Sequence, residues 1–150
     1  MSNASEVRLG GKLEKQKNLE RKTVKEWIKY IQEKIRNNSD YDSVYEEYKI
    51  FLENKLKENP KNVEVICQLA AVYNELTYQW EEIYKLLNEF IKKYENELTD
   101  EEKSRIYTNL GFYYDDQRYG SKRAIRTLRK AVAFNPNNSK AYYGLGADYY

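Results

Sequence analysis

The stretch that decides the fold is Asn135-Pro136-Asn137-Asn138, which is followed by Leu145, Gly146 and Tyr149. An earlier stretch, Asn59-Pro60-Lys61-Asn62, precedes a leucine, a small residue and a tyrosine at the same distances. A third leucine set lies between them without the asparagine–proline motif. The three sets are Leu69-Ala70…Tyr73, Leu110-Gly111…Tyr114 and Leu145-Gly146…Tyr149. Because the leucines are 41 and then 35 residues apart, the chain contains an internal repeat of the length typical of helical repeats.

Each leucine set belongs to an amphipathic helix, because apolar residues recur there at intervals of three and four. The stripes are Ile66, Leu69, Ala70 and Tyr73, then Tyr107, Leu110, Gly111 and Tyr114, then Tyr142, Leu145, Gly146 and Tyr149. A second apolar helix follows each of the first two stripes, with Ile83, Leu87 and Phe90 in one and Ala124, Leu128 and Ala131 in the other. We expect all these stripe residues, tyrosines included, to form the core.

The sequence predicts an all-α fold of about seven helices. We expect helices near 24–37, 41–58, 63–77, 80–95, 100–117, 120–134 and 139–150. Thr23 with Glu26 and Thr99 with Glu102 form capping boxes that favour two of the helix starts. The helices should make antiparallel pairs over 24–58, 63–95 and 100–134, with 139–150 alone. Residues 1–22 are expected to be a flexible or partly helical lead-in to a single domain, 23–150.

The pattern resembles the tetratricopeptide repeat, a helix–turn–helix unit. Its first helix carries Leu, Gly and Tyr, and its second helix carries Ala, a large apolar or aromatic residue, and Ala. The best match runs from Ser104 to Asn138 and includes the closing Pro136. Trp27-x-x-Tyr30 is similar to the start of a half-a-TPR repeat, and Gly111 with Gly120 is similar to Sel1-like repeats. The resemblance implies a right-handed superhelical solenoid whose concave groove is built from the first helix of each pair.

The family's functional residues face this groove, so the resemblance implies which residues bind a peptide or a helix of a partner protein. In this chain they are Gln68, Asn74, Arg105, Thr108, Asn109, Phe112, Asp116, Lys140 and Tyr143. A branch of the family binds the C-terminal carboxylates of chaperones with a set of Lys, Asn and Arg residues on these first helices. Here Cys67, Thr108 and Tyr143 replace its first lysine, so we expect no carboxylate clamp.

Composition favours a binding scaffold and not an enzyme. The chain has no histidine and a single cysteine, which excludes His-based triads, internal disulfides and Cys-cluster metal sites. We expect no catalytic residues, no cofactor and no metal, and we expect Cys67 to be a structural spectator. No apolar run reaches the length of a membrane span, so a cytoplasmic protein without a membrane partner is expected. The formal net charge of +2 does not favour nucleic acid as a partner.

Two alternative functions remain open from the sequence. The Trp27-x-x-Tyr30 motif and the basic residues between Lys122 and Lys130 would suit an RNA-processing assembly factor. The chain would also suit the N-terminal regulatory module of a larger protein. Helix 139–150 carries a full stripe that nothing later in the sequence covers, so we expect truncation after Tyr150, with self-association through this helix as its consequence.

Overall fold

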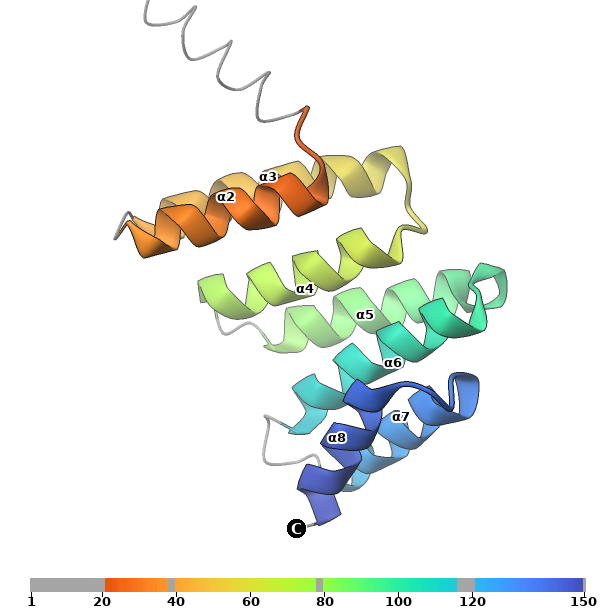
Figure 1. The fold of residues 1–150 in the computed structure, drawn as a ribbon. Coiled ribbons are helices and arrows are strands. Elements are labelled where there is room, and N and C mark those ends of the chain that lie inside the picture. Colours follow the sequence, from red (N-terminus) through yellow and green to blue (C-terminus); the bar gives the residue numbers. More distant parts are fainter. Residues whose placement is uncertain (1–20, 38–39, 78–79, 116–120, 150) are drawn as a thin grey trace, which may run out of the picture.

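The computed structural model describes residues 21–37, 40–77, 80–115 and 121–149, and leaves out the side chains of 77, 121 and 147–149. The described part is all-α, with seven α-helices and one 3₁₀ turn (Figure 1). The elements are α2 (Val24–Arg36), α3 (Tyr41–Glu58), α4 (Val63–Thr77), α5 (Trp80–Tyr94), η1 (Glu95–Glu97), α6 (Asp100–Asp115), α7 (Ser121–Phe134) and α8 (Ser139–Tyr149). The seven predicted helices are confirmed to within about two residues at the described ends. The turn η1 was not predicted, and the lead-in 1–20 lies outside the described residues.

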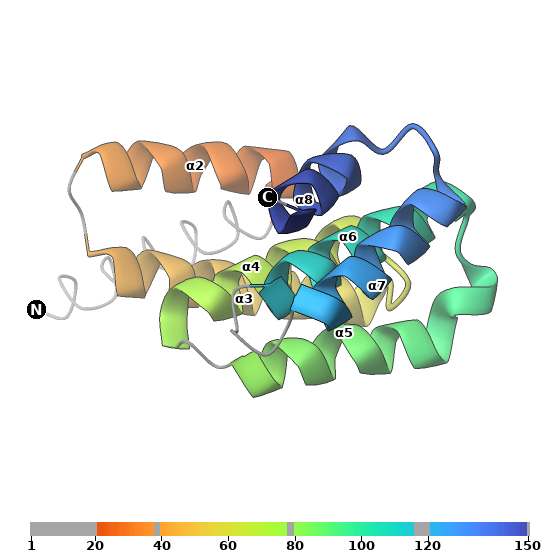
Figure 2. The same ribbon diagram turned by 90° about the horizontal axis from the view of Figure 1, so that it is seen from below.

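Consecutive helices pack against one another, mostly antiparallel, from α2 at one end to α8 at the other (Figure 1). Contacts also skip one helix, because α6 touches both α4 and α8. Figure 2 shows α2 and α8 on one side, α4 and α6 in the middle and α5 on the opposite side. The alternate helices α4, α6 and α8 are thus direct neighbours, which brings their polar residues together.

The two asparagine–proline motifs each end one helix and start the next. The first asparagine of each motif, Asn59 or Asn135, donates its backbone N–H to a carbonyl four residues back. Its side chain also accepts from the N–H two residues ahead, at 3.3 Å and 3.1 Å. The last asparagine, Asn62 or Asn138, accepts from the N–H three residues ahead, at 3.2 Å and 3.1 Å, and so caps the following helix. Each motif is an Asx turn fused to an N-cap, which explains why the residues recur as a unit.

Both predicted capping boxes are confirmed. Thr23 Oγ1 accepts from the Glu26 N–H, and the Glu26 carboxylate accepts from the Thr23 N–H, both at 3.2 Å. Thr99 and Glu102 make the same reciprocal pair at 3.2 Å and 3.1 Å. These contacts satisfy backbone donors that a helix start otherwise leaves without partners.

Most residues of the predicted stripes on α4 to α7 are buried in the core. Leu87, Ala124 and Ala131 are completely buried, and Tyr107 stacks on Phe134 with ring centroids 5.7 Å apart. Tyr73 and Tyr114 are only partly buried, at the margin of one cluster. At the other end of the fold, Trp27, Tyr48 and Phe51 build a separate aromatic cluster between α2 and α3.

The stripe of α8 departs from the prediction. Leu145 is buried, but Tyr142 is 51% exposed, and the prediction that it is a core residue is wrong. The two glycines of the repeat show why. A Cβ at Gly111 would lie 2.7 Å from Leu128, whereas a Cβ at Gly146 would meet nothing within 4 Å. In the described part of the chain, α7 covers this face of α6 and no helix covers the same face of α8. The side chain of Tyr149 lies outside the described residues.

Candidate functional site

A hollow of about 400 Å³ lies where α4, α6 and the start of α8 meet. Five of the nine predicted groove residues line it: Gln68, Arg105, Thr108, Asn109 and Lys140. The other lining residues are Cys67, Ala71, Glu101, Asn135 and Asn138. Because α6 contacts both α4 and α8, residues more than 70 positions apart in sequence lie on one surface.

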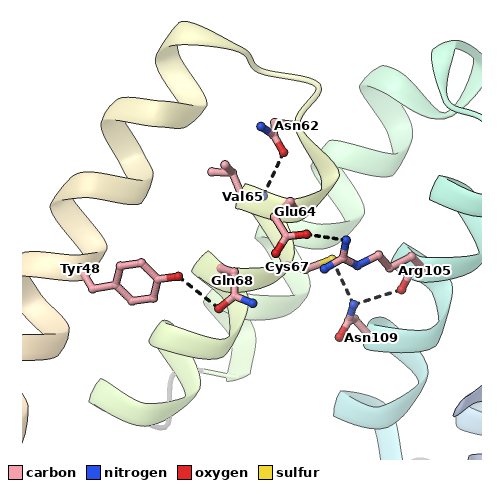
Figure 3. A network of polar contacts seen from close by, with 8 residues as sticks. All are labelled: Tyr48, Asn62, Glu64, Val65, Cys67, Gln68, Arg105 and Asn109. Carbon is pink, nitrogen blue, oxygen red and sulfur yellow. Dashed lines mark hydrogen bonds and ion pairs between the residues drawn. The ribbon is translucent and has the colours of Figure 1, made fainter. Parts of the chain in front are cut away.

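Arg105 bridges α4 and α6 at the edge of this hollow. Its Nη1 donates to Glu64 Oε2 at 2.8 Å, and the two side chains are 45% and 44% exposed (Figure 3). The hydrogen bond to Glu64 raises the pKa of Arg105 above its ordinary value, so the guanidinium is always charged. A pair this exposed contributes little to stability, typically below about 1 kcal/mol. Its effect is to hold the guanidinium in one orientation beside the hollow.

Asn109 and Gln68 are amide side chains of the hollow that each have one polar end satisfied and the other without a partner among the described residues. Asn109 Nδ2 donates to Arg105 O at 3.1 Å and to Cys67 Sγ at 3.0 Å (Figure 3). Gln68 Oε1 accepts from the Tyr48 hydroxyl at 3.3 Å. Within the described part of the chain, nothing donates to Asn109 Oδ1 and nothing accepts from Gln68 Nε2. Asn109 Oδ1 is therefore available to a ligand as a hydrogen-bond acceptor, and Gln68 Nε2 as a donor, beside the cationic groups of Arg105 and Lys140.

Cys67 lies beneath these amides and is buried. Burial, which disfavours the charged thiolate, raises the pKa of Cys67 to about 11, although Arg105 and the hydrogen bond from Asn109 act in the opposite direction. The thiol therefore stays protonated near neutral pH, where it is a poor nucleophile. The chemistry of the hollow is that of hydrogen bonding and charge.

Thr108, which was predicted to contact a partner, lines the hollow, but its hydroxyl already makes hydrogen bonds within the protein. Its side chain is 3% exposed, at the floor of the hollow. The hydroxyl donates to Ser104 O at 2.7 Å and accepts from Asn138 Nδ2 at 2.9 Å. Asn138 also donates to Ser104 Oγ at 2.8 Å. Thr108 and Ser104 thus join α6 to the start of α8, a role for which the repeated asparagine motif was the available sequence signal.

The remaining predicted residues lie beside the hollow or outside the description. Phe112 is partly buried, and Lys140 Nζ lies 5.6 Å from its ring centroid. A Cβ at Gly144 would approach the Phe112 ring to 3.2 Å, so a glycine there lets α8 lie close to α6. Tyr143 is 75% exposed on α8. Asn74 is partly buried on α4 and does not line the hollow, and Asp116 lies outside the described residues.

Sequence reasoning did not select Glu101, Asn135 or Asn138, which also line the hollow.

In the described part of the chain, no group of three or more Cys, Asp or Glu side chains is placed to hold a metal ion. None of the described helices is both long enough and apolar enough to span a bilayer. A scan of protein-family models gives no match for this chain, and neither does a search of curated proteins.

Proposed function

We propose that this chain is a tetratricopeptide-like repeat protein that binds an extended segment of a partner protein along α4, α6 and α8, without catalysis. The observation that carries the proposal is the pair of half-satisfied amides, Gln68 and Asn109, in one hollow. A peptide backbone presents a carbonyl and an N–H, which are the complements of Gln68 Nε2 and Asn109 Oδ1.

Charged and aromatic groups around the amides would add specificity. Arg105 and Lys140 line the hollow, and their cationic ends suit an acidic side chain of the bound segment. Phe112 and the exposed Tyr143 offer aromatic contact area of the kind that dominates binding energy at protein interfaces. The repeated Asx-turn connections and the direct contacts among α4, α6 and α8 support the repeat architecture that this proposal requires.

The test begins with peptides selected on the purified protein from a displayed library of random 12-residue sequences. Affinities of the selected peptides are then measured for the double variant Gln68→Ala and Asn109→Ala. Two lost hydrogen bonds of about 1 kcal/mol each should weaken binding about 30-fold. The matched control is Asn54→Ala, which removes an exposed amide on α3, away from the hollow.

A second variant tests the aromatic contacts. Replacing Asn109, Phe112 and Tyr143 together with alanine should weaken binding further while the helical circular dichroism is retained. If both groove variants bind the selected peptides as tightly as the unmodified protein does, the assignment of the groove is wrong.

A further inference from the structure

Helix α7 carries all its charge in one sign. It contains five basic residues and no acidic residue: Lys122, Arg123, Arg126, Arg129 and Lys130. At about 100° per residue, these five positions fall within an arc of about 120°. All five are exposed, whereas Ala124, Leu128 and Ala131 are buried on the opposite side of the helix. We call this arc the α7 basic face.

The low net charge of the chain does not indicate the excess of positive charge on the α7 basic face. Helix α7 holds five of the 26 basic residues and none of the 24 acidic ones, so the rest of the chain carries three more acidic than basic residues. Most other helices mix the two signs, as α5 does with Glu81 and Glu82 in its first turn and Lys92 and Lys93 in its last, whereas α4 carries only acidic residues. Among the described helices, α7 is the one that carries basic residues and no acidic residue.

Arg126 is the centre of the α7 basic face. It is exposed, and among the described residues it makes no hydrogen bond, ion pair or ring contact. The other four basic residues all lie three or four positions from it, where like charges on a helix repel. Two of them sit over aromatic rings, Arg123 at 5.3 Å from the Tyr114 centroid and Lys130 at 4.9 Å from that of Tyr107. A bound anion would relieve the repulsion around Arg126.

The composition of the face indicates which anion. Protein interfaces rely on apolar and aromatic anchors near their centre. The α7 basic face has none, since Ala133 is the only apolar residue within its arc. Three of the five cations are arginines, whose planar guanidinium matches phosphate oxygens. From Lys122 to Lys130 the array is about 12 Å long, enough to follow several nucleotides of a backbone.

We infer that the α7 basic face binds the phosphodiester backbone of nucleic acid, without reading its sequence. No residue of α7 lines the hollow between α4, α6 and α8, so this site is separate from the proposed peptide groove.

The test measures fluorescence anisotropy of a labelled 20-nucleotide single-stranded RNA, and of a 20-base-pair DNA, between 50 and 200 mM salt. If the five cations each neutralise one phosphate of the RNA, the logarithm of the association constant should fall with the logarithm of salt with a slope of about −3.5. Affinity should then drop about 100-fold over this range. For the duplex DNA, the same five contacts should give a slope of about −4.5. Binding of either nucleic acid with its expected slope supports the inference.

Three variants locate the site. Arg126→Gln should reduce the slope by about 0.7 for RNA, because one phosphate contact is lost. Lys29→Gln removes the same charge from an exposed position on α2 and should leave both slope and affinity nearly unchanged. The double variant Gln68→Ala and Asn109→Ala should bind RNA normally, so a failure of the peptide groove and a failure of this face give different results. Helical circular dichroism and a thermal melt confirm that each variant is folded.

Several outcomes would overturn the inference. The first is that neither nucleic acid shows salt-dependent binding. The second is that Arg126→Gln and Lys29→Gln lose the same affinity for the RNA. The third is that a 20-residue polyglutamate binds as tightly as the RNA. The last result would assign the face to an acidic protein segment.

Discussion

Replacing Asn138 with alanine should lower the free energy of unfolding by more than the loss of a single exposed hydrogen bond would. The side chain makes three hydrogen bonds. Its Oδ1 caps α8 through the Ala141 N–H at 3.1 Å, and its Nδ2 donates to Ser104 Oγ at 2.8 Å and Thr108 Oγ1 at 2.9 Å. Loss of an N-cap costs about 1 kcal/mol, and each further hydrogen bond contributes about 1 kcal/mol. We therefore expect Asn138→Ala to lower the free energy of unfolding by about 3 kcal/mol.

The chain offers a matched control for this prediction. Asn62 holds the same place in the earlier motif and caps α4 at 3.2 Å, but its side chain makes no second hydrogen bond within the described residues. Asn62→Ala should thus cost about 1 kcal/mol. Urea unfolding followed by circular dichroism at 222 nm gives both values, and hydrogen exchange shows whether α8 opens first in Asn138→Ala. If the two variants lose the same stability, Asn138 does not join α8 to α6 as argued.

Two further predictions concern Cys67 and the repeat glycines. Because burial raises the pKa of Cys67 to about 11, the unfolded chain loses the thiol proton at a lower pH than the folded one. Stability should fall by about 1 kcal/mol from pH 8 to pH 9.5, measured by urea unfolding, and an equal fall in Cys67→Ala would contradict this origin. Gly111→Ala should cost about 1–3 kcal/mol, because the new Cβ would meet Leu128 at 2.7 Å. Gly146→Ala has open space and should stabilise by about 0.5–1 kcal/mol, so thermal melts that rank the two variants the other way would refute the packing.

The helices could be predicted from sequence because their signals are local. Apolar spacing, the capping box at Thr23 and the two asparagine motifs each act within one or two turns, so no distant contact was needed to place them. The turn η1 gives no such signal. It occupies Glu95–Glu97, in the connection between the end of α5 at Tyr94 and the start of α6 at Asp100.

The exposure of single residues was harder to predict, because it depends on neighbours distant in sequence. Thr108 and Asn109 are adjacent on α6, yet Thr108 is buried under Asn138, 30 residues away, and Asn109 reaches the hollow. Tyr142 and Tyr107 hold the same repeat position, yet within the described residues only Tyr107 has a second helix, α7, packed over it. The position of a residue in the repeat predicts the direction in which its side chain points. It does not predict which residues of other helices pack against that side chain.

The α7 basic face shows that local charge, like the exposure of single residues, could not be predicted from a property of the whole chain. A net charge of +2 argues against a polyanionic partner only when the charges are mixed over the surface. On α7 they are not mixed, because the buried stripe through Leu128 leaves one side of the helix to solvent and that side carries only cations. At 0.15 M salt the field of such a group extends about 8 Å, so a ligand near Arg126 experiences the local charge of α7 and not the total of the chain. The balance of charge on each exposed helix face, and not that of the whole sequence, therefore decides which partners electrostatics can attract.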